Sequence, residues 1–388
     1  MKKCEFCGKE TEELNVIDGH YCCNDCRENK ELFIICPQYN DYVFKELAVE
    51  VITNSGVQLW CPEAAESHAW KCNDCGKRFE NAVRQNPTSS GYVCDTCAAN
   101  YVRCRHCGQL FRNSDDFTQG VCRHCFEQAE RERLRHVVHS YGYKPLLNFY
   151  GSDDTIFMGF ELESGKAEYK SEMREGLEEL LDDDKEEHFV FKHDSSIPGN
   201  GAEMVTMPMT LAYHKSYKWK EIMEHLGNKA GLKPCRGCGL HVHVNRTATN
   251  NWNWHKIDAF VNNYRSFCEM ISGRSESSYS RYRDVTCTKK QEITSCDHYS
   301  WSTGHGTAVN TGNRDTVEFR IFQATFDVTE LYARLEFLHA LIKHSNSLKA
   351  SDITAKKQSE VDKFVAFVMK HEKQYENLVK YLSKHYSK

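Results

Sequence analysis

The sequence predicts an α+β fold that is preceded by several small cysteine-rich modules. Fifteen of the 20 cysteines lie between Cys4 and Cys125, mostly as C-x-x-C pairs. From about residue 150 onward, short strand patterns are joined by long amphipathic helical patterns and loops. These strands and helices do not alternate in the regular way of a doubly wound parallel sheet, so the pattern favours an α+β architecture.

Length and charge limit the possible functions. The 388 residues are enough for two or three domains, and the formal net charge of -5 argues against a general polyanion-binding protein. The chain contains no run of about 18 apolar residues that would predict a membrane-spanning helix. The first residues, Met1 to Glu5, form no apolar leader, so we expect a cytoplasmic protein without a membrane partner.

Cysteine pairs recur at the spacing of zinc ligands. Three times, two C-x-x-C pairs are separated by 15, 18 or 14 residues. Two such pairs supply four thiolates to one tetrahedral Zn²⁺, whereas a disulfide framework does not need repeated C-x-x-C pairs. We therefore predict three structural zinc sites in a reducing compartment. The ligands are Cys4, Cys7, Cys23 and Cys26; Cys72, Cys75, Cys94 and Cys97; and Cys104, Cys107, Cys122 and Cys125.

The local pattern of these modules suggests treble-clef or zinc-ribbon folds. Each module opens with a C-x-x-C-G turn, in which glycine can take a positive φ, and its second pair leads into a polar, helix-prone run. In the first module Cys22 adjoins Cys23 and could replace it as a ligand. The sequence assigns no role to Cys36 and Cys61, and residues 43–52 fit either a strand or a helix.

These patterns divide the chain into six segments. A connecting segment separates the first zinc module from the second, and the α+β domain follows the third. The predicted segments are zinc module 1 at 1–35, the connecting segment at 36–70, zinc module 2 at 71–100, zinc module 3 with a linker helix at 101–135, the α+β domain at 150–350 and C-terminal helices at 351–388.

Hydrophobic periodicity places strands and helices in the second half of the chain. The helical patterns carry charged faces, which indicates that each helix has one side in solvent. The predicted strands are at 155–164, 187–197, 201–209, 239–245 and 316–325. The predicted helices are at 168–184, 211–231, 254–272, 328–348 and 356–386.

Charged side chains recur two residues apart on three of the predicted strands. Successive strand residues point to opposite sides, so each pair lies on one face and the apolar residues between lie on the other. Glu203 lies on a further strand among apolar neighbours. The pairs are Glu161 and Glu163, His241 and His243, and Glu318 and Arg320.

The predicted polar face brings several carboxylates together on neighbouring strands. Like charges there repel one another, and burial increases the cost. A divalent cation would remove that cost, and carboxylates with an imidazole suit Mg²⁺ or Mn²⁺ better than a structural zinc ion. Mg²⁺ leaves positions open for phosphate oxygens, so we predict a nucleotide-phosphate site. A sheet with one face in solvent and a hydrolytic two-metal site are the alternatives.

Four segments of the α+β domain stand out in order: MGFELE (158–163), HDSSI…GAEMVTMP (193–208), CGLHVHVN (238–245) and TVEFRIF (316–322). In their order and residue types they resemble the motifs of the amidoligase family, one of the carboxylate–amine ligases with glutamine synthetase and glutamate–cysteine ligase. The resemblance implies a curved, mainly antiparallel sheet flanked by helices, with ATP and Mg²⁺ or Mn²⁺ on its concave face. It also implies that ATP converts a substrate carboxylate to an acyl phosphate, from which an amine displaces phosphate to form an amide.

The resemblance implies a ligand set for the metal ions. Glu161 and Glu163 would each ligate a metal ion, and His241 would be the imidazole ligand. Glu203 would complete the site nearer the substrate, and Glu318 would close the part of the site that bridges the phosphates.

The resemblance also implies which residues contact the substrates. His243 would contact a phosphate or the nucleotide, and Arg320 would bind the transferred phosphoryl group. Asp194, in the turn after its strand, would shape the substrate pocket. Arg281 and Arg283 are predicted to bind anions, with a solvated loop as the alternative reading.

One further cysteine pair precedes the histidine strand. Cys235 and Cys238 have the C-x-x-C spacing, but no second pair lies nearby apart from Cys287 and Cys296, which are nine residues apart. We therefore predict two ordinary thiols here rather than half of a fourth zinc site.

The zinc modules are predicted to recognise a macromolecule. Zinc supplies folding free energy to small modules, so they could also serve only to present surfaces. Residues 70–136 contain eleven Lys or Arg and eight Asp or Glu, too small an excess for a strong nucleic-acid footprint. We expect a protein or peptide substrate, with a small amine or amino acid as co-substrate and nucleic acid as the less favoured partner. A binding protein with a non-catalytic ligase-like domain is the alternative.

Overall fold

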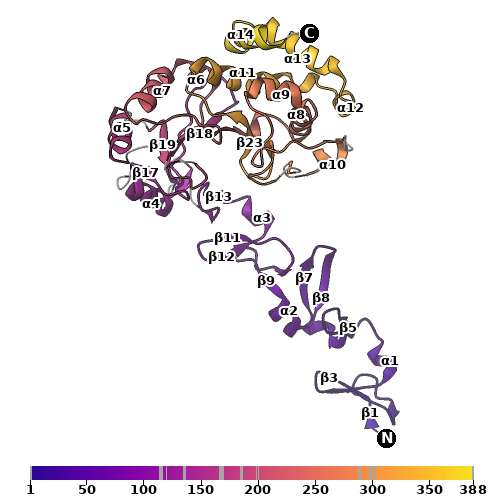
Figure 1. The fold of residues 1–388 in the computed structure, drawn as a ribbon. Helices are drawn as coiled ribbons and strands as arrows, with labels where there is room; N and C mark the ends of the chain where they lie inside the picture. The colour runs from indigo at the N-terminus through magenta and orange to yellow at the C-terminus, as the bar shows by residue number, and fades with distance from the viewer. Residues whose placement is uncertain are drawn as a thin grey trace. The chain divides into compact units, whose positions relative to one another are not determined.

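The chain forms two compact units, Met1–Gln128 and Ala129–Lys388, in the computed structural model (Figure 1). The structure describes residues 2–112, 117–118, 120–133, 137–165, 170–183, 187–197, 199, 201–286, 290–296, 299–300 and 303–386. The predicted mixture of helices and sheets is confirmed. Among the described residues, no helix combines the length and apolar composition that a membrane crossing needs.

The first unit is built from short hairpins and helices in a regular order. A hairpin, a second hairpin and a helix follow one another four times. The first group is β1 (Lys2–Lys3), β2 (Glu10–Thr11), β3 (Asn15–Ile17), β4 (His20–Cys22) and α1 (Asn24–Arg27). The second is β5 (Phe33–Cys36), β6 (Asp41–Phe44), the 3-10 turn η1 (Lys45–Leu47), β7 (Val49–Thr53), β8 (Gly56–Trp60) and α2 (Pro62–His68).

The remaining two groups complete this unit. The third is β9 (Ala69–Lys71), β10 (Arg78–Glu80), β11 (Asn86–Thr88), β12 (Gly91–Val93) and α3 (Asp95–Ala98). The fourth is β13 (Val102–Arg103), β14 (Leu110–Phe111), β15 (Phe117–Thr118), β16 (Val121–Cys122) and α4 (Arg123–Arg133). The second and third groups share a sheet through the parallel pair β7 and β10, and the third and fourth share one through the parallel pair β11 and β14.

Residues 36–70 are not the simple connecting segment that the sequence predicts. They form most of the second group, and the ambiguous stretch 43–52 divides between strand, 3-10 turn and strand. Helix α2 begins after Cys61, whose sulfur accepts a hydrogen bond from the Ala64 amide, and Pro62 occupies the first helical position. The sequence conceals this fold because the segment contains no C-x-x-C pair.

A seven-stranded sheet lies at the centre of the second unit. Its strand order is β17-β19-β20-β18-β21-β23-β22, and all neighbours are antiparallel except β17 and β19. The strands are β17 (Val138–His139), β18 (Met158–Ser164), β19 (Phe189–Lys192), β20 (Ala202–Thr206), β21 (Gly239–Asn245), β22 (Val309–Asn310) and β23 (Thr316–Gln323).

Helices account for about half of the remaining described residues of the second unit. They are α5 (Lys170–Asp183), α6 (Leu211–Ser216), α7 (Trp219–Asn228), α8 (Asn251–Asn263), α9 (Arg265–Ser272), α10 (Lys290–Thr294), α11 (Val328–His344), α12 (Ala350–Thr354), α13 (Gln358–Lys370) and α14 (Glu376–His385). Two 3-10 turns, η3 (Arg246–Ala248) and η4 (Ser345–Ser347), lie between them.

One face of the sheet packs against these helices. The Phe160 ring on β18 lies 5.0 Å from the Trp219 ring on α7, and the Phe322 ring on β23 lies 6.4 Å from Phe337 on α11. Phe337 in turn lies 5.7 Å from Phe364 on α13. The C-terminal helices therefore belong to the same apolar core as the sheet (Figure 1).

Three predicted helices are each interrupted. The prediction of one helix over 211–231 is wrong, because Tyr217 is extended (ψ 153°) and separates α6 from α7. The predicted helix 254–272 divides at Tyr264 (φ -103°, ψ 49°), where α8 ends and α9 begins. The predicted helix 356–386 likewise forms α13 and α14. Short interruptions leave the apolar periodicity almost unchanged, so periodicity alone does not reveal them.

We predict that Gly176→Ala destabilises the second unit. An alanine in a helix normally stabilises by about 1 kcal/mol relative to glycine. In α5, however, a Cβ at Gly176 would lie 2.7 Å from the Ala230 amide nitrogen and 2.8 Å from the Lys229 carbonyl carbon. We expect the free energy of unfolding, from denaturant titration with tryptophan fluorescence, to fall by about 1–3 kcal/mol.

Gly142→Ala is the matched control for this substitution. A Cβ at Gly142 would meet no atom within 4 Å, so we expect a change of less than about 0.5 kcal/mol. An unchanged or higher stability of Gly176→Ala would contradict the close packing of α5.

Candidate functional site

The structure gathers the predicted zinc ligands into three clusters of four thiols. Within each cluster the sulfur atoms all lie within 4.8 Å of one another. The sulfurs of Cys7 and Cys23 are 3.7 Å apart, and those of Cys75 and Cys94 are 4.0 Å apart. A tetrahedral Zn²⁺ with Zn–S bonds of about 2.3 Å needs sulfurs about 3.8 Å apart, so the clusters are compatible with zinc.

Backbone amides prepare the first thiol of each cluster for metal. Burial opposes ionisation, but amide hydrogen bonds outweigh it and lower the pKa of Cys4 and Cys72 to about 6 and that of Cys104 to about 7. The thiolate is the form that binds zinc. In each module the amide of the third cysteine donates to the sulfur of the first: Cys23 to Cys4 at 3.4 Å, Cys94 to Cys72 at 3.4 Å and Cys122 to Cys104 at 3.3 Å.

The first cluster contains Cys23 rather than Cys22. The Cys22 side chain is fully buried in a small core with Ile17 and Phe33, and its thiol donates to the Cys23 carbonyl. Burial raises the pKa of Cys22 to about 11, which favours the neutral thiol. Strand alternation explains the choice, because neighbouring residues at the end of β4 point in different directions.

The three charged pairs and Glu203 lie on the second unit's sheet. The apolar residues that alternate with them, Phe160, Leu240 and Phe319 among others, have no exposed surface and face the helices. The polar residues therefore share the opposite face. Strand register pairs Glu203 with Glu163, Glu161 with His241, and His243 with Glu318.

Glu161 belongs to two groups of possible metal ligands. Glu161, His243 and Glu318 form one group, and Glu161, Glu203 and His241 form the other; within each, the ligand atoms lie within 4.8 Å of one another. His243 Nε2 lies 3.3 Å from Glu161 Oε1, and His241 Nδ1 lies 3.4 Å from Glu161 Oε2. The two oxygens of this carboxylate thus face two different imidazoles, an arrangement that can hold two cations with one shared ligand.

Electrostatics at this face favour a bound cation. Burial, and then the negative charge of Glu161, raise the pKa of Glu203 to about 8. Burial also opposes ionisation of Glu161, but the charge of His243 and a hydrogen bond with His241 hold its pKa well below the usual value. Glu203 is therefore protonated near neutral pH because it is buried and lies beside the charged Glu161, and a divalent cation would relieve that repulsion.

His243 offers a ring nitrogen to this site. Burial lowers its basicity, but the charges of Glu161 and then Glu318 raise its pKa to about 9. Its Nε2 is buried and lacks a well-oriented hydrogen bond to any described residue, although Glu161 and Glu318 carboxylate oxygens lie 3.3 and 4.0 Å away. A buried ring nitrogen facing two carboxylates fits a metal ligand.

Glu163 and Gly239 position His241. Glu163 Oε2 accepts a hydrogen bond from the Gly239 amide at 2.6 Å, and its Oε1 lies 3.8 Å from His241 Nε2. A Cβ at Gly239 would lie 2.8 Å from His241 Nε2, so the imidazole occupies the space that a side chain at position 239 would need.

Glu318 and Arg320 form a buried ion pair on β23. The Asn310 amide on β22 also donates to Glu318 Oε2 at 2.9 Å, and Arg320 Nε donates to the Tyr279 carbonyl at 3.2 Å. Because both partners are held in place, a guanidinium group is fixed beside the ligand group that contains Glu318.

Three predicted anion or substrate contacts have different surroundings. Asp194 Oδ1 accepts from the Ser196 amide at 2.7 Å in the turn after β19, on the Glu203 side of the sheet. Arg283 pairs with the fully buried Asp258, and the anion site predicted at Arg283 stays a prediction. Arg281 is exposed and pairs through its backbone with Thr307.

The prediction of two ordinary thiols at Cys235 and Cys238 is wrong, because these residues form a disulfide. The Cys238 amide donates to the Cys235 carbonyl at 3.0 Å, and this tight turn brings the Cα atoms to 5.0 Å. A half-site for zinc is likewise ruled out there. Cys287 lies outside the described residues, and Cys296 is exposed.

Sequence reasoning missed three polar residues at the edges of this face. Lys192 on β19 pairs in register with Glu203, and its ammonium lies 5.4 Å from the Tyr141 ring. Burial and the charges of Asp194 and Glu203 raise the pKa of Tyr141. The spacing of Lys192 and Asp194, two residues apart, could have revealed the lysine. Asn310, the third, lies on a strand too short for a periodicity signal.

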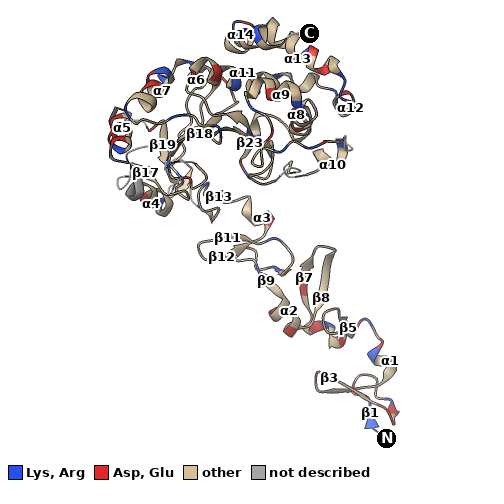
Figure 2. Ribbon diagram, viewed as in Figure 1, with Lys and Arg blue, Asp and Glu red and all other residues tan. Residues whose placement is uncertain are grey.

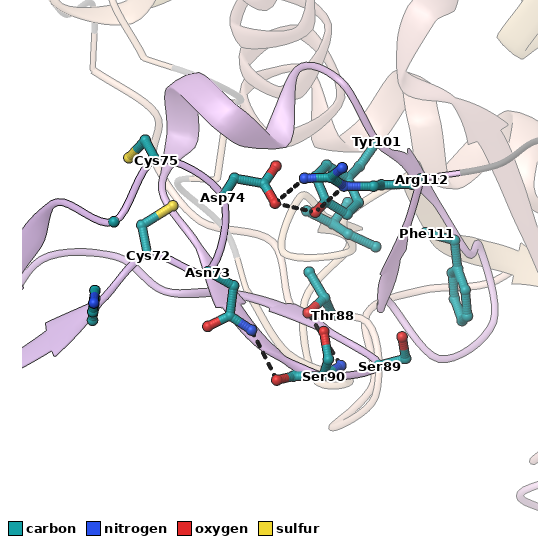
Figure 3. A pocket seen from close by; sticks show the side chains of 13 residues that line it. Cys72, Asn73, Asp74, Cys75, Thr88, Ser89, Ser90, Tyr101, Phe111 and Arg112 are labelled. Atoms are coloured by element: carbon teal, nitrogen blue, oxygen red, sulfur yellow. Dashed lines mark hydrogen bonds and ion pairs between the residues drawn. The ribbon is translucent and has the colours of Figure 1, made fainter.

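A separate cleft lies between the third and fourth groups of the first unit. It has a volume of about 830 Å³ and is lined by polar residues of both groups, including Asn73, Ser89 and Ser90 (Figure 3). Tyr101 donates to Asp74 at 2.8 Å, and Arg112 donates to Tyr101 at 3.0 Å and pairs with Asp74 (Figure 3). This network joins the two groups along one side of the cleft.

We predict that the purified chain holds three zinc ions. Cys23→Ser should lower the metal content to two, because it removes a ligand. Cys22→Ser should keep three, because the adjacent thiol lies in a core rather than in a cluster. Elemental analysis of the folded variants measures both. Loss of zinc from Cys22→Ser with retention by Cys23→Ser would contradict the ligand assignment.

We also predict that Mn²⁺ binding to the carboxylate face strengthens as pH rises from about 7 to 9. Glu203 holds a proton when the pH is below its pKa of about 8, and His243 is protonated when the pH is below its pKa of about 9. A metal must displace these protons, so the dissociation constant should fall by up to about tenfold per pH unit for each proton released. Isothermal titration calorimetry at each pH, in two buffers with different ionisation enthalpies, measures the dissociation constant and the number of protons released. A pH-independent affinity would contradict these protonation states.

Comparison with known proteins adds no family to these observations. No family model matches the chain, and no curated protein matches it. The amidoligase resemblance therefore stays a prediction that rests on four short segments. The three cysteine clusters, by contrast, are compatible with zinc modules at the level of atomic positions.

Proposed function

We propose that the protein is an ATP-dependent carboxylate–amine ligase that forms an amide through an acyl phosphate. The observation that carries the proposal is Glu161, whose carboxylate is shared by two groups of metal ligands on one sheet face. A site that transfers a phosphoryl group needs cations close to one another and a fixed positive group beside them. Arg320 supplies the latter next to Glu318.

The residues of this face would bind two cations and the transferred phosphoryl group. Glu161, Glu203 and His241 would hold one cation, and Glu161, His243 and Glu318 a second. When bound, such cations neutralise phosphate oxygens and the charge that develops on them. Arg320 would stabilise the transferred group, since its guanidinium is already oriented and needs little reorganisation.

Lys192 and Asp194 lie on the Glu203 side of the sheet and are suited to the two substrates, the carboxylate that donates the acyl group and the amine that accepts it. Lys192 would attract a substrate carboxylate, while Asp194 is placed to orient an incoming amine. Tyr141, exposed at 60%, lies beside the lysine and could cover the substrate from solvent. This side would therefore bind the carboxylate and amine, and the Glu318 side the nucleotide.

The zinc modules would recognise a protein or peptide substrate. The polar cleft between the third and fourth groups has room for several side chains, and basic and acidic residues are interspersed along this unit (Figure 2). Mixed charge suits a peptide better than a nucleic-acid backbone, which requires a basic surface.

A metal-dependent hydrolase using the same ligands is the second candidate, because two cations sharing a carboxylate also occur in hydrolytic sites. The two functions differ in what controls ATP consumption. A ligase releases ADP and phosphate in proportion to amide formed, and only when both a carboxylate and an amine are present. Assays with Mg²⁺ and pools of peptides, carboxylic acids and amines would separate them by mass spectrometry of the products.

We predict that Glu161→Gln lowers ATP turnover by more than about 100-fold, since it removes a charge from both ligand groups. Glu175→Gln, at an exposed position of α5, is the matched control and should keep wild-type turnover. Zinc content should stay the same in both variants. Absence of ATP binding by the wild type at millimolar nucleotide and Mg²⁺ would reject the ligase.

A further inference from the structure

The second group of the first unit, residues 33–68, repeats the turn that opens each zinc module. The amide four residues after its first cysteine, that of Asn40, donates to the Cys36 carbonyl at 2.8 Å. Asn40 has a φ of 57°, in the left-handed region that asparagine adopts more readily than most residues. The corresponding donors in the zinc modules are Gly8, Gly76 and Gly108, with bonds of 2.9–3.0 Å and φ of 73–77°.

The same group also repeats the contact between the two halves of a zinc module. The Cys61 amide donates to the Cys36 sulfur at 3.3 Å, as the third cysteine of each zinc module does to the first. Cys61 occupies the N-cap position of α2, as Cys23 does in α1 and Cys94 in α3. Although burial opposes ionisation, hydrogen bonds from Cys61 lower the pKa of Cys36.

Contacts between neighbouring groups independently match Cys36 to the first cysteine of each zinc module. Asp74 lies two residues after Cys72, the first cysteine of the third group. It contacts Tyr101 and Arg112, which lie three residues before and eight residues after Cys104, the first cysteine of the fourth group. The equivalent positions around Cys4 and Cys36 are occupied by three phenylalanines in mutual contact. Their ring centroids are 5.3 Å apart for Phe6 and Phe33, 5.4 Å for Phe6 and Phe44, and 4.8 Å for Phe33 and Phe44.

We infer that residues 33–68 are a fourth copy of the zinc module that folds without metal. In this copy Tyr39 and Ala64 occupy the positions of the second and fourth ligands, three residues after Cys36 and Cys61. Two thiols remain, which is half of a tetrahedral thiolate site. Cys36 and Cys61 therefore keep the backbone arrangement of zinc ligands without forming a zinc site.

An apolar core replaces the metal in this copy. Trp60, Val51 and Ala64 have no exposed surface and pack with both cysteines. Strands β7 and β8 have five residues each, whereas the equivalent β3, β4, β11 and β12 have three. Helix α2 has seven residues, compared with four in α1 and α3, whereas α4, which runs past the end of the first unit at Gln128, has eleven. Longer elements bury more apolar surface, which supplies the folding free energy that zinc supplies elsewhere.

Restoring the two thiols tests this inference. The full chain with Tyr39→Cys and Ala64→Cys together should bind four zinc ions, one more than the wild type. The matched control, Tyr39→Ser with Ala64→Ser, places serines, which are similar in size to cysteine, at the same positions and should still bind three zinc ions. A folded double-cysteine variant that stays at three would overturn the inference, as would a wild type with four.

Hydrogen exchange of the wild type provides a second test that does not depend on a variant. A strong chelator should remove protection from residues 72–97 and 104–125, whose modules depend on zinc. The amides of β8 should stay protected, because β8 pairs with β7 and packs on a core without metal. Strand β8 is the readout because β7 also pairs with β10 of the zinc-dependent third group. Loss of protection in β8 together with the zinc modules would overturn the inference.

Discussion

The position of β18 between β20 and β21 is the constraint on which the candidate site depends. Both pairings are antiparallel, so Glu161 and Glu163 stand level with partners on either side. The apolar residues that alternate with them are buried against the helices, and this burial fixes the register. A shift of one residue would move Phe160 and Leu162 to the polar face and the glutamates into the core, so the core and the ligand geometry are specified together.

The sequence predicts much of this arrangement but not all of it. Alternation places Glu161, His241 and Glu318 on polar faces of their strands, since a period of two is a strong signal. It does not give strand order, and so it could not show that Glu161 would be the ligand common to both groups. Asn310 was missed because it lies on an edge strand of two residues, whereas Lys192 was missed although its spacing from Asp194 follows the strand period of two.

In the cysteine-rich unit the sequence predicts the metal ligands but not the whole fold. Its three zinc clusters follow directly from C-x-x-C spacing, because tetrahedral coordination permits few spacings. The fold of residues 33–68 leaves no such mark, since Asn40 replaces a glycine and apolar packing replaces two thiols. The tight turn from Cys235 to Cys238 exposes a related limit: spacing alone does not distinguish a metal half-site, free thiols and a disulfide.

The shared carboxylate of Glu161 also has a consequence for charge balance. Glu161, Glu163, Glu203 and Glu318 together would neutralise two divalent cations. Lys192 and Arg320, opposed by Asp194, would then leave the face with one excess positive charge. Such a face would be poorly stable on its own, and a polyphosphate would supply the missing negative charge. Occupation by metal and occupation by nucleotide would therefore be interdependent, each completing the electroneutrality of the other.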